Sequence, residues 1–269
     1  MEFNKTIVMF DMDGTLTEPR QKFKDPDLDD ALYRLTNTGV HIGIITGSDE
    51  DYLREQMGEF LRRSSCRYKI HLMPCNGTKY FEPPKFANQD FTMTHSVSMK
   101  KHLGSDNYRR LLQELILSQV DMSNDEIPLT GHFINCRGSL INWCPIGRNA
   151  NDEEREIFRA IDEKVGLRKR VIDELKMMLK QKGLLNRLTI KFGGDTSFDI
   201  YPKGWDKTYG LRHFRNWDIW FVGDRCCENG NDYEIYNTCK YSSQAYKTNG
   251  PKKTTEIVDT IITRLKEKS

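Results

Sequence analysis

Short apolar runs alternate along the chain with segments whose hydrophobic residues have helical spacing. Lys5–Phe10 predicts a buried strand because its apolar and β-branched residues are continuous. Asp25, followed by proline, is typical of a helix start, and apolar residues then recur at helical spacing. Further apolar runs at Val40–Ile45 and Tyr68–Met73 repeat the strand pattern. Strands that alternate with helices predict a parallel sheet covered on both faces.

The pattern changes where Glu82 is followed by two prolines, a polar stretch typical of a linker. Beyond it, His132–Trp143 predicts a hairpin, and strand patterns follow at Arg187–Phe192 and Ser197–Tyr201. Because hairpin neighbours pair in opposite directions, this part predicts an antiparallel sheet. Helical spacing predicts helices near residues 106–120, 152–165 and 169–182.

The strand and helix alternation of the first part returns after residue 202. Trp217–Val222 is another continuous apolar run, and an amphipathic helix follows near the end of the chain. The second part is therefore predicted to be inserted into the first. We expect an α/β core of residues 1–84 and 203–269 that carries an inserted α+β domain of residues 85–202.

Charge and hydropathy limit the classes of function. The chain has 41 Lys+Arg and 39 Asp+Glu, a formal net charge of +2, which argues against a nucleic-acid partner. Hydrophobic residues make up 37% and charged residues 30%, as in globular proteins. The first ten residues lack the pattern of a signal peptide, and no run approaches the ~20 apolar residues of a membrane span. We therefore expect a cytoplasmic protein without a membrane partner.

Acidic residues follow two of the predicted strands. Asp11 and Asp13 come after the first strand, Asp224 comes after Trp217–Val222, and Lys207 opens a predicted helix. The carboxyl ends of parallel strands meet at one edge of an open sheet, where ligands bind. Carboxylate oxygens are ligands that Mg²⁺ prefers, and of two neighbouring carboxylates one can attack while the other moves a proton. Each residue alone is more often an ordinary turn or surface residue, so their shared position is what favours a catalytic site.

A third predicted strand end carries hydroxyl groups. Thr46 and Ser48 follow Val40–Ile45 and precede a predicted helix, so their hydroxyls and the nearby N–H groups could bind an anion. The same residues are equally typical of an ordinary helix cap, and Ser48–Asp51 resembles a capping box.

Four segments at predicted strand ends and helix starts read DMDGT, IITGSD, GWDK and GDRCCENGND. In this order they resemble the four motifs of the haloacid dehalogenase superfamily of phosphoryl-transfer enzymes. More narrowly, the chain resembles the eukaryotic-type phosphomannomutase family over nearly its whole length. The segments that carry this resemblance are FDMDGTLTEPRQ (10–21), CPIGR (144–148), GGDTSFDIYPKGWDKTYGLRHF (193–214) and FVGDRCCENGNDYEIY (221–236). The resemblance implies a Rossmann-like haloacid dehalogenase core with an inserted cap domain that selects the substrate.

The resemblance also implies a reaction. Phosphate would move between C6 and C1 of mannose through a hexose 1,6-bisphosphate, which also acts as activator, and the product would supply GDP-mannose synthesis. Asp11 would be the nucleophile that forms an aspartyl phosphate, and Asp13 the general acid/base. Lys207 and the hydroxyls of Thr46 and Ser48 would position the transferring group. Phosphoglucomutase activity is a further expectation.

Binding roles are implied in the same way. Mg²⁺ would be held by Asp11, Asp224, Asp232 and the backbone carbonyl of Asp13, and the enzyme would form a homodimer through its cap. The remaining implied substrate contacts are Arg137, Arg148 and Arg155 to the phosphate that is not transferred, Ser197 and Asp199 to sugar hydroxyls, and Arg20 in the core.

The chain departs from the family pattern after the last strand motif. Residues 225–230 lack the family's proline and one of its glycines, although Asp224 and Asp232 keep their spacing. Thr238 stands where some relatives have an aspartate for a second cation, and no second cation is predicted. Two alternatives therefore remain: a sugar-phosphate phosphatase of the same superfamily, and a catalytically silent protein that binds phosphosugars.

Overall fold

The structure is a computed structural model that describes residues 5–123, 126–228 and 230–268. The chain folds into two compact units, Met1–Ser96 with Asp206–Ser269, and Val97–Trp205. The expected boundaries were 84/85 and 202/203. The first differs because residues 85–96, assigned to the inserted domain, include a strand of the first unit's sheet.

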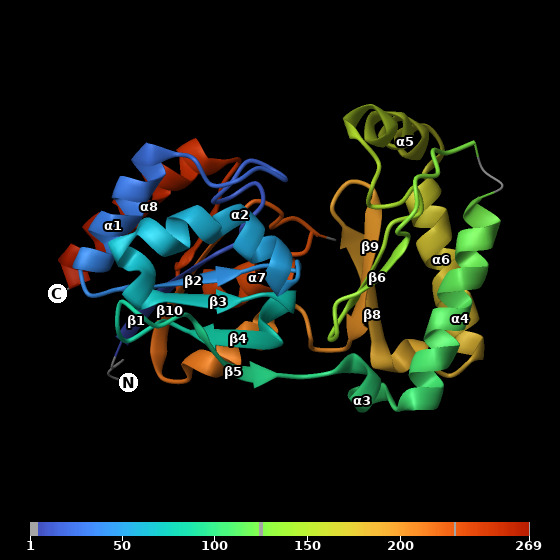
Figure 1. Ribbon diagram of the computed structural model, residues 1–269, viewed down its shortest axis with the longest axis horizontal. Helices are drawn as coiled ribbons and strands as arrows, with labels where there is room; N and C mark the ends of the chain where they lie inside the picture. Colours follow the sequence, from blue (N-terminus) through green and yellow to red (C-terminus); the bar gives the residue numbers. More distant parts are fainter. Residues whose placement is uncertain (1–4, 124–125, 229, 269) are drawn as a thin grey trace. The chain divides into compact units, whose positions relative to one another are not determined.

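The first unit is built on a seven-stranded sheet of order β11-β10-β1-β2-β3-β4-β5 (Figure 1). The five strands from β11 to β3 run parallel, whereas β4 and β5 pair antiparallel at one edge. The strands are β1 (Lys5–Phe10), β2 (His41–Ile45), β3 (Ile70–Met73), β4 (Lys79–Glu82), β5 (Thr92–Ser96), β10 (Trp217–Gly223) and β11 (Ala245–Lys247). The predicted parallel α/β core is confirmed, with an antiparallel edge that the sequence did not predict.

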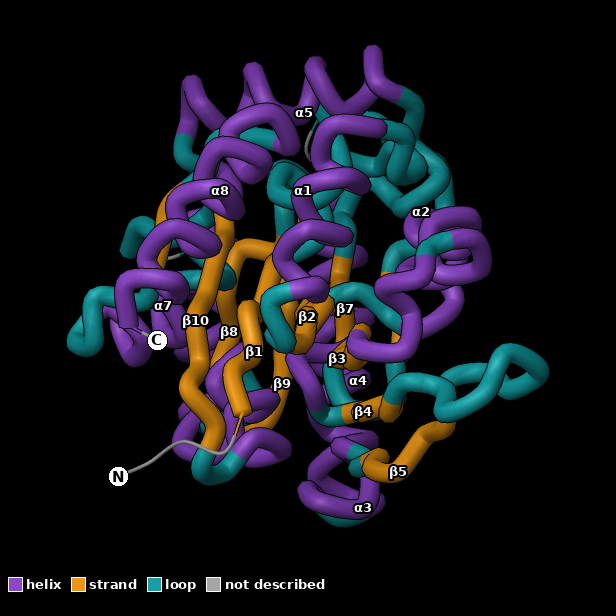
Figure 2. The backbone as a smooth tube through the Cα atoms, turned by 90° about the vertical axis from the view of Figure 1, so that its left-hand side faces the viewer, coloured by secondary structure: helices purple, strands orange, loops and turns teal. Residues whose placement is uncertain are grey.

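Helices cover both faces of this sheet (Figures 1 and 2). On one face lie α1 (Pro26–Asn37), α2 (Glu50–Arg63) and α8 (Pro251–Lys268), which share a buried core with Val8 and Phe10 of β1. On the other face, Ile7 and Met9 pack with residues of the 3₁₀ helix η4 (Lys207–Phe214) and of α7 (Tyr233–Lys240). Alternate residues of β1 thus enter opposite cores, as expected of a central strand. The remaining short helices are η1 (Ser65–Lys69) and η2 (Cys75–Gly77).

The second unit has a four-stranded antiparallel sheet of order β6-β7-β9-β8. Its strands are β6 (Ile134–Cys136), β7 (Ile141–Trp143), β8 (Leu188–Gly193) and β9 (Ser197–Pro202). Its helices are α3 (Met99–Leu103), α4 (Ser105–Met122), α5 (Asp152–Val165), α6 (Leu167–Gln181) and η3 (Leu185–Arg187). The predicted α+β unit with an antiparallel sheet is confirmed.

The two faces of the second sheet differ in chemistry. Trp143 and Phe198 are register partners whose rings lie 5.0 Å apart, and Trp143 donates a hydrogen bond to Gln119 of α4, so this face meets the helix. On the opposite face, Asn142 of β7 pairs with Asp199 of β9. Strand alternation therefore separates an apolar, helix-covered face from a polar one. Among the described residues, no helix is long and apolar enough to cross a membrane.

Candidate active site

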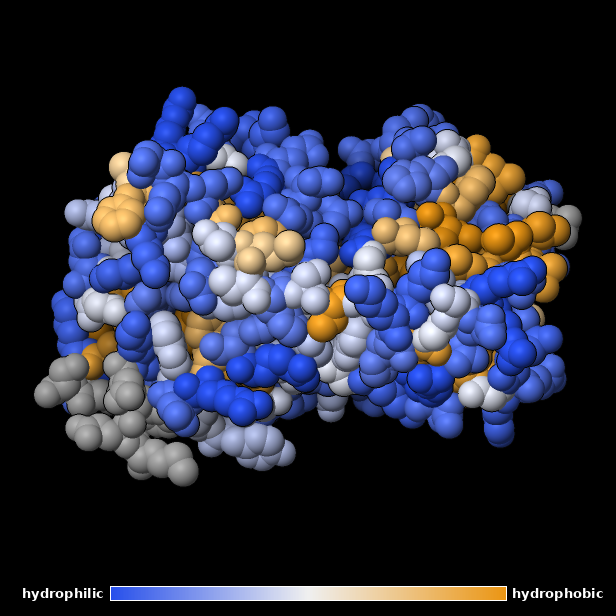
Figure 3. All heavy atoms as spheres, turned by 60° about the horizontal axis from the view of Figure 1, so that its bottom comes forward, coloured by the Kyte–Doolittle hydropathy of each residue, from blue (hydrophilic) through white to orange (hydrophobic). Residues whose placement is uncertain are grey.

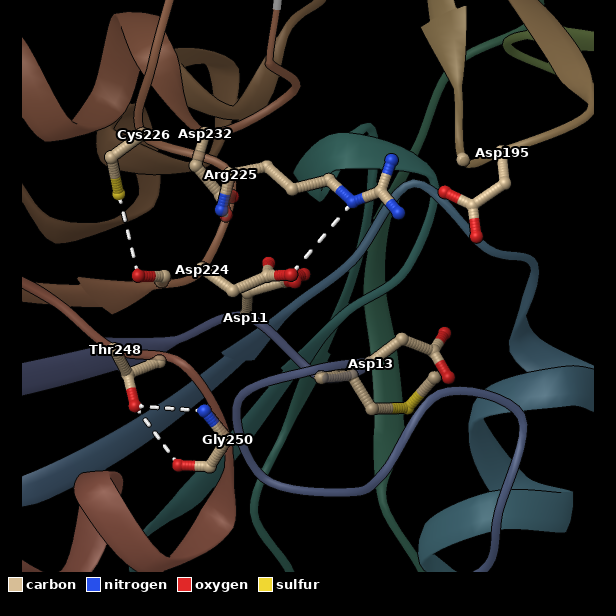
Figure 4. Close-up of polar contacts among 12 residues, drawn as sticks. Asp11, Asp13, Asp195, Asp224, Arg225, Cys226, Asp232, Thr248 and Gly250 are labelled. Atoms are coloured by element: carbon tan, nitrogen blue, oxygen red, sulfur yellow. Dashed lines mark hydrogen bonds and ion pairs between the residues drawn. The ribbon is translucent and has the colours of Figure 1, made fainter. Parts of the chain in front are cut away.

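Acidic residues gather at the carboxyl edge of the parallel sheet (Figure 4). Asp11 directly follows β1, and Asp224 directly follows the neighbouring strand β10. Asp232 precedes α7, and Lys207 is the first residue of η4. Ligand atoms of the three aspartates lie within 4.8 Å of one another. The fold therefore brings together residues that lie far apart in the sequence.

Lys207 lies between two of these carboxylates. Its Nζ donates to Asp11 Oδ1 and to Asp232 Oδ1, each at 2.5 Å, and the lysine is 1% exposed. Burial alone would lower the pKa of Lys207, but attraction to Asp11 and Asp232 outweighs this and raises it. The lysine is therefore a buried ammonium ion that fixes the orientation of both carboxylates.

The acidic cluster carries more negative charge than Lys207 can balance. Burial raises the pKa of Asp11 well above its usual value, and repulsion from Asp232 and Asp224 adds to the shift, against the attraction of Lys207. Burial also raises the pKa of Asp224, with Asp232 as the next cause. Asp224 Oδ1 is buried and has no hydrogen-bond partner among the described residues. Three hard oxygen donors, one of them without a partner, fit a divalent cation such as Mg²⁺.

Asp13 lies in the same region but its side chain is not part of this cluster. Its Oδ1 accepts hydrogen bonds from the Tyr52 hydroxyl at 3.1 Å and from the Arg20 backbone N–H at 2.9 Å. In Figure 4 its carboxylate lies apart from the carboxylates of Asp11 and Asp224. The Asp13 carboxylate is therefore fixed by its own hydrogen bonds, outside the cluster of Asp11, Asp224 and Asp232. Arg20, a predicted substrate contact, reaches Asp13 through its backbone and has a left-handed φ of 61°.

Two glycines let the backbone approach the carboxylates. A Cβ atom at Gly14 would lie 2.5 Å from Asp224 Oδ2, and φ at Gly14 is +80°. A Cβ atom at Gly223 would lie 2.6 Å from Asp232 Oδ2. Any larger residue at either position would displace a carboxylate of the cluster.

Thr46 and Ser48 follow β2, the neighbour of β1 in the sheet, and so lie at the same edge. Thr46 is buried, and its Oγ1 accepts a hydrogen bond from the Ser48 backbone N–H at 3.1 Å. The residue that caps α2 is Asp49, which accepts from the Tyr52 N–H, rather than the expected Ser48. The Ser48 hydroxyl is thus not needed to cap the helix.

Four of the five predicted residues of the second unit are linked by hydrogen bonds: Arg148, Arg155, Ser197 and Asp199. Arg148 donates to Asn142, and Asn142 donates to both Ser197 and Asp199. Arg155 donates to the backbone carbonyls of Arg148 and Ala150 and to the Thr196 hydroxyl. Arg137 is buried at the turn between β6 and β7, where its N–H donates to the Leu140 carbonyl.

Sequence reasoning missed two residues of these sites, Tyr52 and Asn142. Tyr52 lies in the first turns of α2, where an aromatic residue is typical of the core. Asn142 sits within a short strand next to Trp143. Only strand alternation, which places Asn142 on the face opposite Trp143, could have indicated it. Of the altered loop at 225–230, Asn229 lies outside the described residues.

Solved structures define the class of fold. A structure of the IMP-nucleotidase of Plasmodium falciparum matches 96% of this chain and 67% of that chain with a TM-score of 0.64 at 15% identity. A trehalose-6-phosphate phosphatase of Aspergillus fumigatus matches 99% of this chain and 94% of that chain with a TM-score of 0.53 at 15% identity. The fold, with its acidic cluster at the carboxyl edge of the parallel sheet, is of the haloacid dehalogenase type.

Sequence comparisons narrow this class to one family. The family model for eukaryotic phosphomannomutase matches residues 28–264. Phosphomannomutase 1 of Dictyostelium discoideum is 37% identical over 237 residues, which cover 86% of this chain and 87% of that protein. A phosphomannomutase of Drosophila melanogaster is 33% identical over 267 residues, which cover 96% of each chain. The chain belongs to the eukaryotic phosphomannomutase family, which supports phosphomannomutase activity on a hexose phosphate.

Proposed function

We propose that the protein interconverts mannose 6-phosphate and mannose 1-phosphate through a phosphoenzyme and a hexose 1,6-bisphosphate, in support of GDP-mannose synthesis. The observation that carries this proposal is the arrangement of Asp11, Lys207 and Asp232 at the carboxyl edge of the sheet. Lys207 fixes the Asp11 carboxylate through one oxygen, which leaves the other oxygen as the nucleophile.

Each half of the reaction moves one phosphoryl group. In the first half, Asp13 takes the proton from the free hydroxyl of the sugar monophosphate, and this oxygen attacks the aspartyl phosphate. A P–O bond forms at the sugar, the O–P bond at Asp11 breaks, and the product is the hexose 1,6-bisphosphate. The bisphosphate then turns around. In the second half, a carboxylate oxygen of Asp11 attacks the other phosphorus, an O–P bond forms at Asp11, and the P–O bond to the sugar breaks while Asp13 gives its proton to the departing sugar oxygen. Added bisphosphate phosphorylates a resting enzyme through this second half alone.

Positive charge and hydrogen-bond donors at this site lower the free-energy barrier of phosphoryl transfer. The Lys207 ammonium and the Thr46 and Ser48 hydroxyls position the transferring oxygens. We assign Mg²⁺ to Asp11, Asp224 and Asp232 with the backbone carbonyl of Asp13. When bound, this ion supplies further positive charge to the phosphoryl oxygens.

The second unit supplies substrate recognition in this proposal. The planar guanidinium groups of Arg137, Arg148 and Arg155 suit the phosphate that is not transferred. The side-chain oxygens of Ser197 and Asp199 accept hydrogen bonds from sugar hydroxyls in this proposal, and Arg20 is the substrate contact of the first unit. We assign the second unit, Val97–Trp205, to a cap that excludes water from the aspartyl phosphate.

Oligomeric state and location belong to the same proposal. We propose a homodimer formed through the second unit, since Ile116, Leu117 and Val120 are exposed together on α4. Apolar side chains gather on this part of the surface in Figure 3. All seven cysteines are free thiols, which suits the reducing cytoplasm.

A sugar-phosphate phosphatase is the second candidate, because a trehalose-6-phosphate phosphatase shares the fold. A coupled assay with mannose 1-phosphate, Mg²⁺ and hexose 1,6-bisphosphate separates the two. The mutase proposal predicts that isomerisation exceeds release of inorganic phosphate and depends on the bisphosphate. Dominant phosphate release would favour the phosphatase, and absence of both would favour a silent binding protein. The same assay with glucose 1-phosphate tests phosphoglucomutase activity.

A further inference from the structure

The polar face of the second unit's sheet carries a buried asparagine that joins the proposed substrate contacts. Asn142 is 3% exposed, and its register partner Asp199 is 9% exposed. The neighbouring residue Trp143 points to the opposite face, where it bonds to α4. The Asn142 side chain therefore lies among polar groups rather than in the apolar core.

Both ends of the Asn142 amide are used. Its Nδ2 donates to Asp199 Oδ1 at 2.7 Å and to Ser197 Oγ at 3.0 Å. Its Oδ1 accepts from Arg148 Nη1 at 2.9 Å. The positive and negative partners fix the orientation of the amide, because only the oxygen can face the guanidinium and only the NH₂ can face the carboxylate. No other side chain of similar size offers two donors and one acceptor in this arrangement.

A second set of hydrogen bonds, made by Arg155, joins the same two segments. Arg155 donates to the carbonyl of Arg148 at 3.0 Å and to the hydroxyl of Thr196, the neighbour of Ser197, at 2.8 Å. Arg155 thus joins the Arg148 loop to the start of β9, while Asn142 joins the side chains that extend from them. Without Asn142, the side chains of Arg148 and Asp199 would lose the group that bonds to both of them.

We infer that Asn142 is a positioning residue that sets Arg148, the proposed phosphate contact, at a fixed place relative to Ser197 and Asp199, the proposed sugar contacts. The inference rests on the proposed function for the identity of these contacts. One oxygen of Asp199 accepts a hydrogen bond from Asn142, which restricts rotation of the carboxylate. A ligand whose phosphate and hydroxyl are separated by the same distance as Arg148 and Asp199 binds more tightly, because neither side chain has to be ordered on binding.

The test is calorimetric titration of the full-length protein with mannose 1-phosphate, with thermal unfolding measured on the same samples. Asn142→Ala leaves Asp199, Ser197 and Arg148 without their shared partner, and we expect affinity to fall by about tenfold or more. Asn142→Ser has a hydroxyl with one donor where the amide has two, so it should give an intermediate affinity. It replaces the alanine variant in the test if that variant does not fold.

Gln119→Ala is the matched control. Gln119 also uses both ends of its amide, accepting from Trp143 Nε1 and donating to the Pro145 carbonyl, but it does so from the helix-covered face. This variant should lose thermal stability and keep the wild-type affinity. A merely structural role for Asn142 predicts instead that variants of equal stability loss bind alike.

The outcomes separate this inference from the proposed function. Wild-type affinity in both Asn142 variants, or an equal loss in Gln119→Ala, would overturn the inference. If the wild type binds mannose 1-phosphate without isomerising it, the mutase proposal fails, whereas the comparison of variants still decides the role of Asn142. A wild type that does not bind mannose 1-phosphate would overturn the inference as well.

Discussion

Lys207 is a fully buried ammonium group whose presence in the core is explained by its two carboxylate partners. A buried charge is costly unless it is paired, and Asp11 and Asp232 both lie at 2.5 Å. Removing the lysine would leave two buried carboxylates facing each other. The residue thus contributes both to the stability of the first unit and to the orientation of the proposed nucleophile.

Lys207→Met should therefore reduce both activity and stability. We expect mutase turnover to fall by about 10³-fold, as for loss of a preorganised electrostatic group, and the free energy of unfolding to fall by about 3–5 kcal/mol. Steady-state kinetics and urea denaturation measure the two effects. Lys203→Met, at an exposed position nearby, is the control and should change neither. Wild-type turnover in Lys207→Met would contradict the assigned role.

A substitution at Gly223 tests the role of the acidic cluster without changing any charged residue. A Cβ atom there would lie 2.6 Å from Asp232 Oδ2 and 2.7 Å from a ring atom of Phe221, so Gly223→Ala should displace Asp232. We expect the dissociation constant for Mg²⁺ to rise by about tenfold, measured by calorimetric titration.

Gly58→Ala is the control for this substitution. Gly58 lies within α2, and an added Cβ atom meets nothing within 4 Å. Because alanine favours a helix over glycine, the control should keep its Mg²⁺ affinity and gain up to about 1 kcal/mol in stability. An unchanged Mg²⁺ affinity in Gly223→Ala would argue against Asp232 as part of the metal site.

The sequence could indicate two of the charged residues of the first site because each of them follows an apolar run. Asp11 and Asp224 stand where continuous hydrophobic strands stop, and this is visible in the sequence. The contact of Lys207 with Asp232 depends instead on how η4 and α7 lie against the sheet. The same is true of Tyr52, whose hydroxyl reaches Asp13 across 39 positions of sequence. Such long-range contacts have no local pattern.

Element prediction succeeded where the hydrophobic pattern was strong. The buried strands β1, β2, β3 and β10 and the amphipathic helix α1 follow from runs and spacing that the sequence displays. By contrast, β5 (TMTHS) is exposed along most of its length and has no alternation, because it lies at the edge of the sheet. β11 has only three residues, and no periodicity can be detected over so short a segment.

β2, β3 and β4 bring together titratable groups that stay neutral in the folded protein. His41 Nδ1 and His71 Nε2 lie 3.0 Å apart, and His71 Nδ1 lies 2.8 Å from the Tyr80 hydroxyl. Burial lowers the pKa of His41 to about 4 and of His71 to about 3, with Lys5 adding to both shifts. These histidines resist protonation that the unfolded chain accepts near pH 6.5.

Stability should therefore fall as the pH is lowered. The contribution of the histidines is fully present above about pH 6.5, where both states are neutral, and is lost progressively toward pH 4 as the unfolded chain takes up protons. Urea unfolding at several pH values measures how steeply the free energy of unfolding changes with pH. His71→Gln should reduce the slope in this range, whereas His102→Gln, at an exposed position in α3, should leave it unchanged. An identical slope in His71→Gln would contradict this prediction.

The exposed face of α4 concerns the assembly of the whole molecule. Ile116, Leu117 and Val120 are each more than half exposed, at 54%, 56% and 57%. Three neighbouring apolar side chains on one helix are costly to leave in water, so a second copy of the chain is the proposed partner.

Leu117→Glu should convert the proposed dimer into a monomer, because a carboxylate would be buried in the interface without a partner. Size-exclusion chromatography with light scattering measures the mass. Thr260→Glu places the same charge at an exposed position of α8, in the first unit, and should remain dimeric. A wild type that is monomeric at micromolar concentration would argue against this assembly.

Both units contribute to the proposed reaction, but only the first holds the group that is modified. In the proposed reaction a phosphoryl group is carried covalently by Asp11, and Lys207 and a metal ion would offset its negative charge. Every other role assigned here, including those of the arginines in the second unit, depends on this step.

The most direct test is to identify the phosphorylated residue. The protein is mixed with Mg²⁺ and hexose 1,6-bisphosphate labelled in its phosphate, denatured rapidly in acid, and mapped by peptide mass spectrometry. We expect the label on the peptide that contains Asp11 and on no peptide of Asp11→Asn. Isomerisation of mannose phosphates by a wild type that carries no label, or carries it on another residue, would contradict the account.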